Sequence, residues 1–261
     1  MIQRKWSLLS LLENNSDGGG NTAGELAHYK FTVSYDGTLY WGFQHQNGHP
    51  TIQAEIECAL RKIGWNGTHI IGAGRTDRGV HAAGQVFSAW LNSRHALTAL
   101  VAAINVRLPR DIAILAVQPV ADDFHARYDA SARCYRYSVY HSEIRDPLKE
   151  RFFLRVWPEL DLETLNKAAA VLIGEHDFRA FGSPPRKNGR TVRIVRQSRW
   201  ERTQNGTLSF EVEANGFLYH MVRRMVYLQI QLACGLISWE DWQKAIELGQ
   251  PAKQGIVPPH G

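Results

Sequence analysis

The sequence predicts an α+β protein made of two similar halves. In the first half, hydrophobic residues switch between the alternation of strands and the spacing of helices in the order β-α-β-β-α-β. This is the split pattern in which four strands form one sheet and both helices cover the same face. A similar order starts again after residue 133, and two such halves would leave a cleft between them.

In the first half, the expected elements begin or end at recognisable signals. A strand ends at the turn pair Asp36-Gly37, and Thr51 is a suitable N-cap for the first helix. The β-branched pair Ile70-Ile71 marks the end of a buried strand. The expected strands cover residues 29–35, the stretch up to 71, 85–90 and 112–117, and the expected helices cover 51–63 and 96–106.

In the second half, a hairpin turn at Asn205-Gly206 joins two strands, and Ser238 can cap a final helix. The expected strands cover residues 134–140, 192–200 and 208–213, and the expected helices cover 162–173, 217–234 and a stretch after Ser238. A closing strand is not evident. We therefore expect a disordered leader over residues 1–28, an N-terminal half over 29–128, and a C-terminal half over 129–261 that lacks its last strand.

The composition is that of an ordinary globular chain with a basic excess. The chain has 261 residues, a net charge of +5 and a pI near 9.2, which favours a polyanionic partner such as nucleic acid. Cys58, Cys134 and Cys234 lie far apart without C-x-x-C spacing, so neither a disulfide framework nor a zinc cluster is expected. The apolar run at residues 6–12 is too short to span a bilayer. We therefore expect a cytoplasmic protein with no metal and no membrane contact.

Residues 72–82 carry more chemically active side chains than any neighbouring stretch. Glycines flank an acid, two arginines and a histidine at the end of a strand. Such loops often carry chemistry, because the sheet fixes the side chains and glycine allows close approach. Neither common phosphate-binding glycine pattern fits, since Asp77 replaces the third glycine of one and Val80 the lysine of the other. No nucleotide cofactor is therefore implied.

Asp77 is the residue of this loop that most needs explanation. Arg75 and Arg78 beside it favour the ionised form of its carboxyl group. An ionised aspartate can be a nucleophile, a general base or a salt-bridged turn residue. The local sequence alone favours the turn residue, so more distant residues must decide.

A basic run lies between residues 179 and 202, with arginines at nearly every third position. Val192, Ile194 and Val195 favour a strand there, so successive side chains would point to opposite faces. Only part of the run can then face one ligand. By itself it fits a solvated surface nearly as well as an RNA-binding one.

Several separated segments together resemble the tRNA pseudouridine synthases of the TruA family. The most specific is the motif G-R-T-D-x-G-V-H-A around Asp77. The other matching segments follow in the same order as in the family: Y-D-G at 35–37, G-F-Q at 42–44, F-H-A-R at 124–127, R-x-Y-x-Y at 133–137, H-D-F at 176–178 and G-F-L-x-H-M-V-R at 216–223. The resemblance extends from about residue 29 to the C-terminus.

The resemblance implies a two-lobed fold with a central cleft and a homodimer. It implies isomerisation of uridine to pseudouridine on the 3′ side of the tRNA anticodon stem-loop, at tRNA positions 38–40. The expected architecture is two pseudo-equivalent split β-α-β halves, ferredoxin or RRM-like, that form one continuous, mainly antiparallel sheet with helices on one face. The family closes with an apolar strand that supplies a leucine to the site, whereas this sequence ends at His260-Gly261.

The resemblance also assigns roles to residues of the matching motifs. Asp77 matches the catalytic aspartate, Tyr135 the active-site tyrosine, and Arg223 the arginine expected to pair with the carboxylate. Arg75 matches an arginine thought to support base extrusion and tRNA contact. The full expected site comprises catalytic Asp77, Tyr135 and Arg223 and substrate-binding Arg75, Arg78, His81, Tyr35, Gln44 and Phe178.

The chemistry of the residues fits this assignment. Pseudouridine formation breaks and remakes a glycosidic bond without a redox change, so no cofactor is expected. A carboxylate could attack the ring or the sugar, or deprotonate the sugar, and the sequence does not choose among these. Tyr135 could stack on the base and exchange a proton, or it could be a core tyrosine. Arg223 lies on an otherwise apolar helix and needs an anionic partner, for which Asp77 is the natural candidate.

Two other functions remain open from the residues alone. Split β-α-β sheets with aromatic residues are common in non-catalytic RNA-binding proteins, but no RNP-type aromatic stretch is evident and Asp77 would be unexplained. A carboxylate-dependent nucleoside hydrolase usually works with two carboxylates, and no second acid recurs near the motif. We therefore favour the isomerase.

Overall fold

The computed structural model describes residues 26–260 apart from 93–95, 185, 187 and 252. The expected disordered leader therefore lies outside the described residues up to position 25. Residues 26–28 belong to the first strand, which runs over Leu26–Tyr35. None of the helices in the described part of the chain is long and apolar enough to cross a lipid bilayer.

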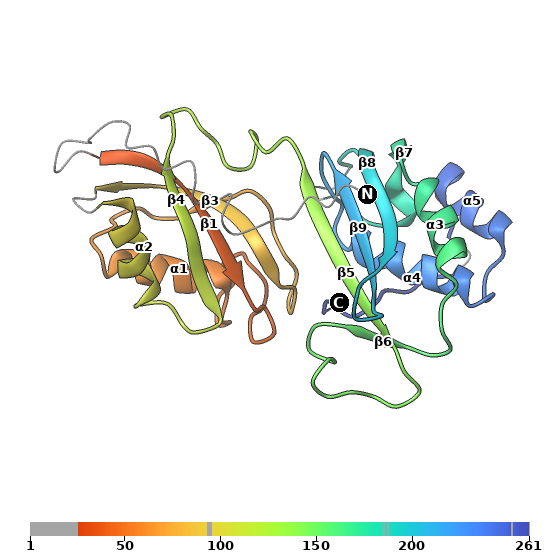
Figure 1. Ribbon diagram of the computed structural model, residues 1–261. Coiled ribbons are helices and arrows are strands. Elements are labelled where there is room, and N and C mark those ends of the chain that lie inside the picture. The colour runs from red at the N-terminus through yellow and green to blue at the C-terminus, as the bar shows by residue number, and fades with distance from the viewer. Residues whose placement is uncertain (1–25, 93–95, 185, 187, 252, 261) are drawn as a thin grey trace.

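The N-terminal half has the expected order β-α-β-β-α-β. Its elements are β1 (Leu26–Tyr35), α1 (Ile52–Arg61), β2 (Ile71–Gly72), β3 (Ala82–Asn92), α2 (Leu97–Asn105) and β4 (Ile112–Pro119). The strands pair antiparallel in the order β2-β3-β1-β4, with α1 and α2 packed beside them (Figure 1). The split β-α-β prediction is confirmed for this half.

The alternation along β1 gives this sheet two different faces. Phe31 and Val33 are fully buried in the core shared with α1 and α2, while Lys30 and Thr32 line the opposite side. Thr51 caps α1 as expected, because its hydroxyl accepts a backbone hydrogen bond from the first turn. The helices therefore cover one face and leave the other for a cleft.

Strand β2 differs from the prediction. It has only 2 residues and lies at the edge of the sheet. Ile70 is buried just before it, but Ile71 is 40% exposed. An edge strand has a neighbouring strand on one side only, so its residues are less covered than those of a central strand. The prediction of a buried strand end is therefore right for Ile70 and wrong for Ile71.

The C-terminal half contains a second sheet and three helices among its described residues. Its elements are β5 (Arg133–His141), β6 (Leu154–Val156), α3 (Leu162–Ala170), β7 (Gly174–Asp177), the 3-10 turn η2 (Phe178–Ala180), β8 (Val192–Arg202), β9 (Leu208–Ala214), α4 (Met221–Ala233) and α5 (Trp239–Glu247). The strand order is β6-β5-β9-β8-β7, antiparallel except for the parallel pair β5-β6. The short strands β6 and β7 were not predicted, and no strand follows α5 within the described residues.

The strands of the described residues form two separate sheets, so the expected continuous sheet is wrong on that point. The two halves lie side by side, each with its own helices (Figure 1). Between them, side chains replace the missing strand pairing: Arg133 at the start of β5 donates from Nε and Nη2 to the carbonyl oxygen of Ala73, at 3.1 and 2.7 Å. The α+β class, the split β-α-β pattern and the mainly antiparallel sheets are confirmed.

Candidate active site

The two halves enclose a cleft of about 3570 Å³. Residues of β1, β3 and β4 line it on one side and residues of β5, β8 and β9 on the other, together with residues 72–78 and 216–223. The walls are therefore mainly sheet faces, with residues of α2 and of the start of α4 at the margins. Both motifs that dominate the resemblance meet in this cleft.

Residues 73–81, here called the Asp loop, rest on residues 36–43, here called the Gly turn. The N–H of Phe43 donates to the carbonyl oxygen of Thr76 at 3.1 Å. Gly42 has a φ of +99°, and a Cβ added there would lie 2.6 Å from the same oxygen. Only glycine allows this close approach of the two backbones. The Gly turn therefore fixes the position of the Asp loop in the cleft.

Asp77 meets an arginine and a histidine of the other half. Its Oδ2 lies 3.3 Å from Nη1 of Arg223 and 3.4 Å from Nε2 of His220. The side chain of Asp77 is 23% exposed and that of Arg223 is 19% exposed. Arg223 also donates from Nε to the carbonyl oxygen of Val257 at 2.8 Å, which fixes its guanidinium. The predicted pairing of Asp77 with Arg223 is present.

His220 is a residue of the site to which the sequence assigned no role. It has a φ of 65° and stands immediately before α4, so the helix begins at Met221 rather than at residue 217. Burial lowers the pKa of its imidazole, against the opposing effect of Asp77, which keeps the ring neutral near pH 7. The signal available in the sequence was its place in the motif that also contains Arg223.

Tyr135 lines the cleft from β5. Its ring packs edge-on against Phe217, with centroids 4.8 Å apart. Burial raises the pKa of its hydroxyl, and the charge of Asp77 acts in the same direction, while Arg133 opposes them. Tyr135 therefore presents a protonated hydroxyl in the cleft close enough to feel the charge of Asp77.

Three other predicted residues lie exposed on the wall of the cleft: Arg75, Arg78 and Gln44. The guanidinium carbon of Arg78 lies over the ring of Trp41, 4.0 Å from its centroid. This cation–π contact restrains the Arg78 side chain. These positions suit contact with a large anionic ligand.

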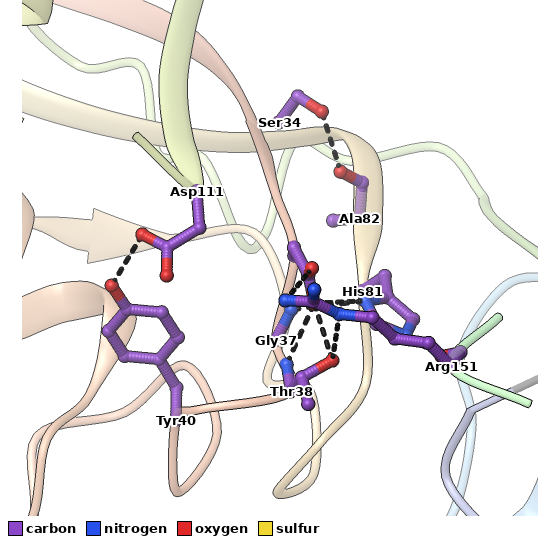
Figure 2. Close-up of polar contacts among 9 residues, drawn as sticks. Ser34, Gly37, Thr38, Tyr40, His81, Ala82, Asp111 and Arg151 are labelled. Atoms are coloured by element: carbon purple, nitrogen blue, oxygen red, sulfur yellow. Dashed lines mark hydrogen bonds and ion pairs between the residues drawn. The ribbon is translucent and has the colours of Figure 1, made fainter. Parts of the chain in front are cut away.

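Tyr35 and His81 have structural contacts in addition to their place near the cleft. Tyr35 is buried, and its hydroxyl lies 2.8 Å from Oγ1 of Thr76. This contact holds the Asp loop against the sheet. His81 also lines the cleft, but its ring contacts the backbone of Gly37 and of Arg151, as Figure 2 shows.

Phe178 does not reach the cleft, and its expected substrate-binding role is not supported. Its side chain is fully buried in the core of the C-terminal half, with Phe181 5.9 Å away between ring centroids. The H-D-F motif therefore contributes a core residue here.

The basic run over residues 179–202 divides between the cleft and the surface. Arg193 and Arg199 line the cleft, whereas Arg179 and Arg202 pair with nearby acids. Strand alternation separates Arg193 and Arg199 from Arg202 on β8, whereas Arg179 lies in η2, outside that strand. The described residues contain no cluster of three His, Cys, Asp or Glu side chains suited to a metal ion.

A family model described as tRNA pseudouridine synthase matches residues 31–129 and 168–261. The chain belongs to the tRNA pseudouridine synthase family. The first matched segment holds the Asp loop and the second holds the start of α4, so both members of the Asp77–Arg223 pair fall within the match.

Individual members of the family are similar over most of their length. The tRNA pseudouridine synthase A 2 of Clostridium perfringens is 36% identical over 90% of this chain and 97% of its own. The tRNA pseudouridine synthase A of Listeria monocytogenes is 39% identical over 85% of this chain and 90% of its own. That of Moorella thermoacetica is 42% identical over 78% and 83%. The chain is thus an isomerase of this family, which favours that function over RNA binding alone or nucleoside hydrolysis.

Proposed function

We propose that this protein isomerises uridine to pseudouridine on the 3′ side of the tRNA anticodon stem-loop, with Asp77 as its catalytic carboxylate. The observation that carries the proposal is the position of Asp77: on a glycine-rich loop in the cleft, 3.3 Å from Arg223 of the other half. A carboxylate paired in this way is held oriented at the place where an extruded base could enter.

The carboxylate contacts distinguish its two oxygens. Within the described residues, both polar contacts of the Asp77 carboxylate go to Oδ2. We therefore expect Oδ1 to react with the uridine, either by attack on the ring or sugar or by removal of a sugar proton. Tyr135, kept protonated, would exchange a proton with the detached base or stack on it.

Substrate binding is expected to use the cleft cations. A target base in a stem-loop must leave its stack, at a cost of a few kcal/mol, so the phosphates on either side have to be held. Arg75 and Arg78 are exposed on the cleft wall and suit that task. Gln44 and His81 would contribute polar contacts from the same wall.

The proposal includes a homodimer and a cytoplasmic location. Both follow from the family resemblance, and the three free, exposed cysteines fit a reducing compartment. Light scattering of the purified protein across a dilution series tests the dimer, and a mass corresponding to one chain at all concentrations would contradict it.

The deciding experiment measures pseudouridine formation on a tRNA transcript labelled with tritium at C5 of uridine. Wild type should release tritium, because C5 of the base becomes the glycosidic carbon. Asp77→Asn should lower the rate by at least about 10²-fold. Glu240→Gln is the matched control and should leave the rate unchanged, because Glu240 lies on helix α5 and its one ion pair among the described residues is with Lys244.

Other products would point to other functions. Free uracil in the wild-type reaction would indicate the hydrolase, and tRNA binding without any conversion would indicate the RNA-binding module. Conversion by Asp77→Asn at the wild-type rate would remove Asp77 from the chemistry.

A further inference from the structure

Arg151 of the C-terminal half contacts the N-terminal half at several points. It lies on the segment between β5 and β6, and its Nη2 lies 2.5 Å from Oδ2 of Asp36. Its Nε donates to Oγ1 of Thr38 at 3.2 Å, and its carbonyl oxygen lies 3.1 Å from Nε2 of His81. Figure 2 shows the side chain reaching Thr38 from its own segment. One residue thus joins both the Gly turn and the Asp loop.

His81 keeps its contact with Arg151 in either charge state of its ring. Nδ1 lies 3.1 Å from the backbone N of Gly37 and 3.0 Å from Oδ1 of Asp36. A neutral ring accepts from Gly37, and a protonated ring donates to Asp36. In both forms Nε2 carries a proton and donates to the carbonyl oxygen of Arg151. The ring of Phe152 packs against His81 with centroids 4.8 Å apart.

The position of the Gly turn is transmitted to Asp77 because the Gly turn and the Asp loop touch. A Cβ on Gly37 would lie 2.0 Å from the carbonyl oxygen of Val80. The N–H of Gly79 donates to the carbonyl of Tyr40 at 3.2 Å, and the N–H of Val80 to the carbonyl of Asp77 at 3.1 Å. With the backbones this close, a shift of the Gly turn must shift Asp77.

The other end of the Asp loop is held in a similar way. Arg133 donates two hydrogen bonds to the carbonyl oxygen of Ala73. Three arginines of the C-terminal half therefore hold the loop: Arg133 at its start, Arg223 at its acid and Arg151 near its end. Charged donors make the stronger class of hydrogen bond, so the loop is fixed relative to the second half.

We propose that Arg151 is a positioning residue that sets the distance between Asp77 and Arg223. The inference rests on the proposed function and adds a residue remote from the carboxylate. The Arg151 side chain is 48% exposed, and exposed ion pairs contribute little to stability. Its effect is therefore on geometry, and misplacement of reacting groups by about 1 Å costs about 100-fold in rate.

The test compares Arg151→Gln with Arg155→Gln in single-turnover pseudouridine formation. Arg155 is a matched control, because its polar contacts among the described residues all lie in its own half: the carbonyl oxygens of Ser142 and Glu143, and the carboxylate of Glu150. Arg151→Gln should lower the rate by about 10- to 100-fold with tRNA affinity within twofold of wild type. Arg151→Lys should restore part of the rate, and Arg155→Gln should match wild type.

A second readout is independent of catalysis. Hydrogen exchange at the amides of Gly37, Gly79 and Val80 should be faster in Arg151→Gln and unchanged in Arg155→Gln. Adding Asp36→Asn to Arg151→Gln should slow the reaction no further, because both changes remove the same contact.

Distinct results would overturn the inference. A rate within twofold of wild type would do so, as would weaker tRNA binding at an unchanged rate, which would make Arg151 an RNA contact. If wild type itself forms no pseudouridine, the proposed function fails, and unchanged exchange at the three amides would separately reject the positioning role.

Discussion

Tyr135 illustrates how the surroundings of a single side chain decide its chemistry. An ordinary tyrosine titrates near pH 10, but burial and the charge of Asp77 raise the pKa of Tyr135. The raised pKa excludes a tyrosinate nucleophile at neutral pH and leaves a hydroxyl that can donate a proton. The packing of the ring therefore keeps the hydroxyl protonated, as the proton exchange proposed for Tyr135 requires.

A spectrophotometric pH titration can check this protonation state without any RNA. The difference between wild type and Tyr135→Phe isolates the tyrosinate absorbance of one residue. Because the pKa is raised from 10.0, that absorbance should appear only above pH 10. Tyrosinate signal from this residue below pH 10 would rule out the assigned environment.

The same substitution has an expected kinetic effect. Tyr135→Phe keeps the ring that packs on Phe217 but removes the proton donor, so tRNA affinity should stay within twofold. The rate of pseudouridine formation should fall by about 10²-fold or more. Filter-binding and single-turnover assays on the same preparation separate these two effects.

At the scale of elements, the Gly turn and the Asp loop behave as one unit. Their backbones touch at Gly37 and at Gly42, where a side chain would meet the carbonyl oxygens of Val80 and Thr76. A loop supported in this way does not need a long strand before it. This explains how the 2-residue strand β2 can carry the loop that holds Asp77.

Gly37→Ala should push the Gly turn and the Asp loop apart. The added methyl would lie 2.0 Å from a backbone oxygen, so the turn must move, which should cost about 1–3 kcal/mol of stability. Gly84→Ala is the control for stability, because its nearest new contact is a methyl of Thr32 at 3.8 Å. Urea unfolding of both variants measures the difference, and equal midpoints would contradict the close packing.

A buried acid of helix α1 binds the backbone of Ile70, shortly before the Asp loop. Glu57 is 2% exposed, and its carboxylate accepts from Gln53 at 2.8 Å and from the backbone N–H of Ile70 at 3.2 Å. Glu57→Ala leaves both donors without an acceptor, so we expect the free energy of unfolding to fall by about 3 kcal/mol. Glu55→Ala on the same helix should cost much less, as thermal unfolding of the pair will show.

At the scale of the whole molecule, the cleft contains cations of two kinds. Arg136 and Arg199 are paired with Glu211, at 2.5 and 2.9 Å. Arg75 and Arg78 have no acid within 4 Å in the described part of the chain. Phosphates should therefore be drawn to Arg75 and Arg78, beside Asp77, more strongly than to Arg136 and Arg199, because charges already paired attract them less.

The salt dependence of tRNA binding tests that difference. Arg75→Gln and Arg78→Gln should each reduce the slope of log affinity against log salt by about 0.7–0.9. Arg136→Gln, whose charge is already paired, should change the slope far less. Equal effects of all three variants would mean that ion pairing in the cleft does not direct the RNA.

The parts of the fold that could be predicted are those with a local signal. The order of the first half, the Thr51 cap and the Asp77–Arg223 pair follow from periodicity, capping chemistry and the need of a shielded cation for an acid. Phe178 was misassigned because a motif does not show which way an aromatic ring points.

Other features depend on contacts that sequence reasoning does not see. The start of α4 is set by the positive φ of His220, which a non-glycine residue rarely adopts. Strand β6 pairs over only 3 residues, too few for periodicity. Arg151 reaches Thr38 across 113 residues of sequence, and no local pattern records a contact at that separation.

Because both halves contribute residues to the site, the site forms late during synthesis of the chain. The acid and its guanidinium partner are 146 positions apart in the chain, so a nascent polypeptide emerging from the ribosome exposes the carboxylate long before α4 exists. During that interval the acid has no counter-ion from the second lobe and the cleft has only one wall. Competence to modify RNA therefore arrives only after α4 has been translated and the second lobe docks.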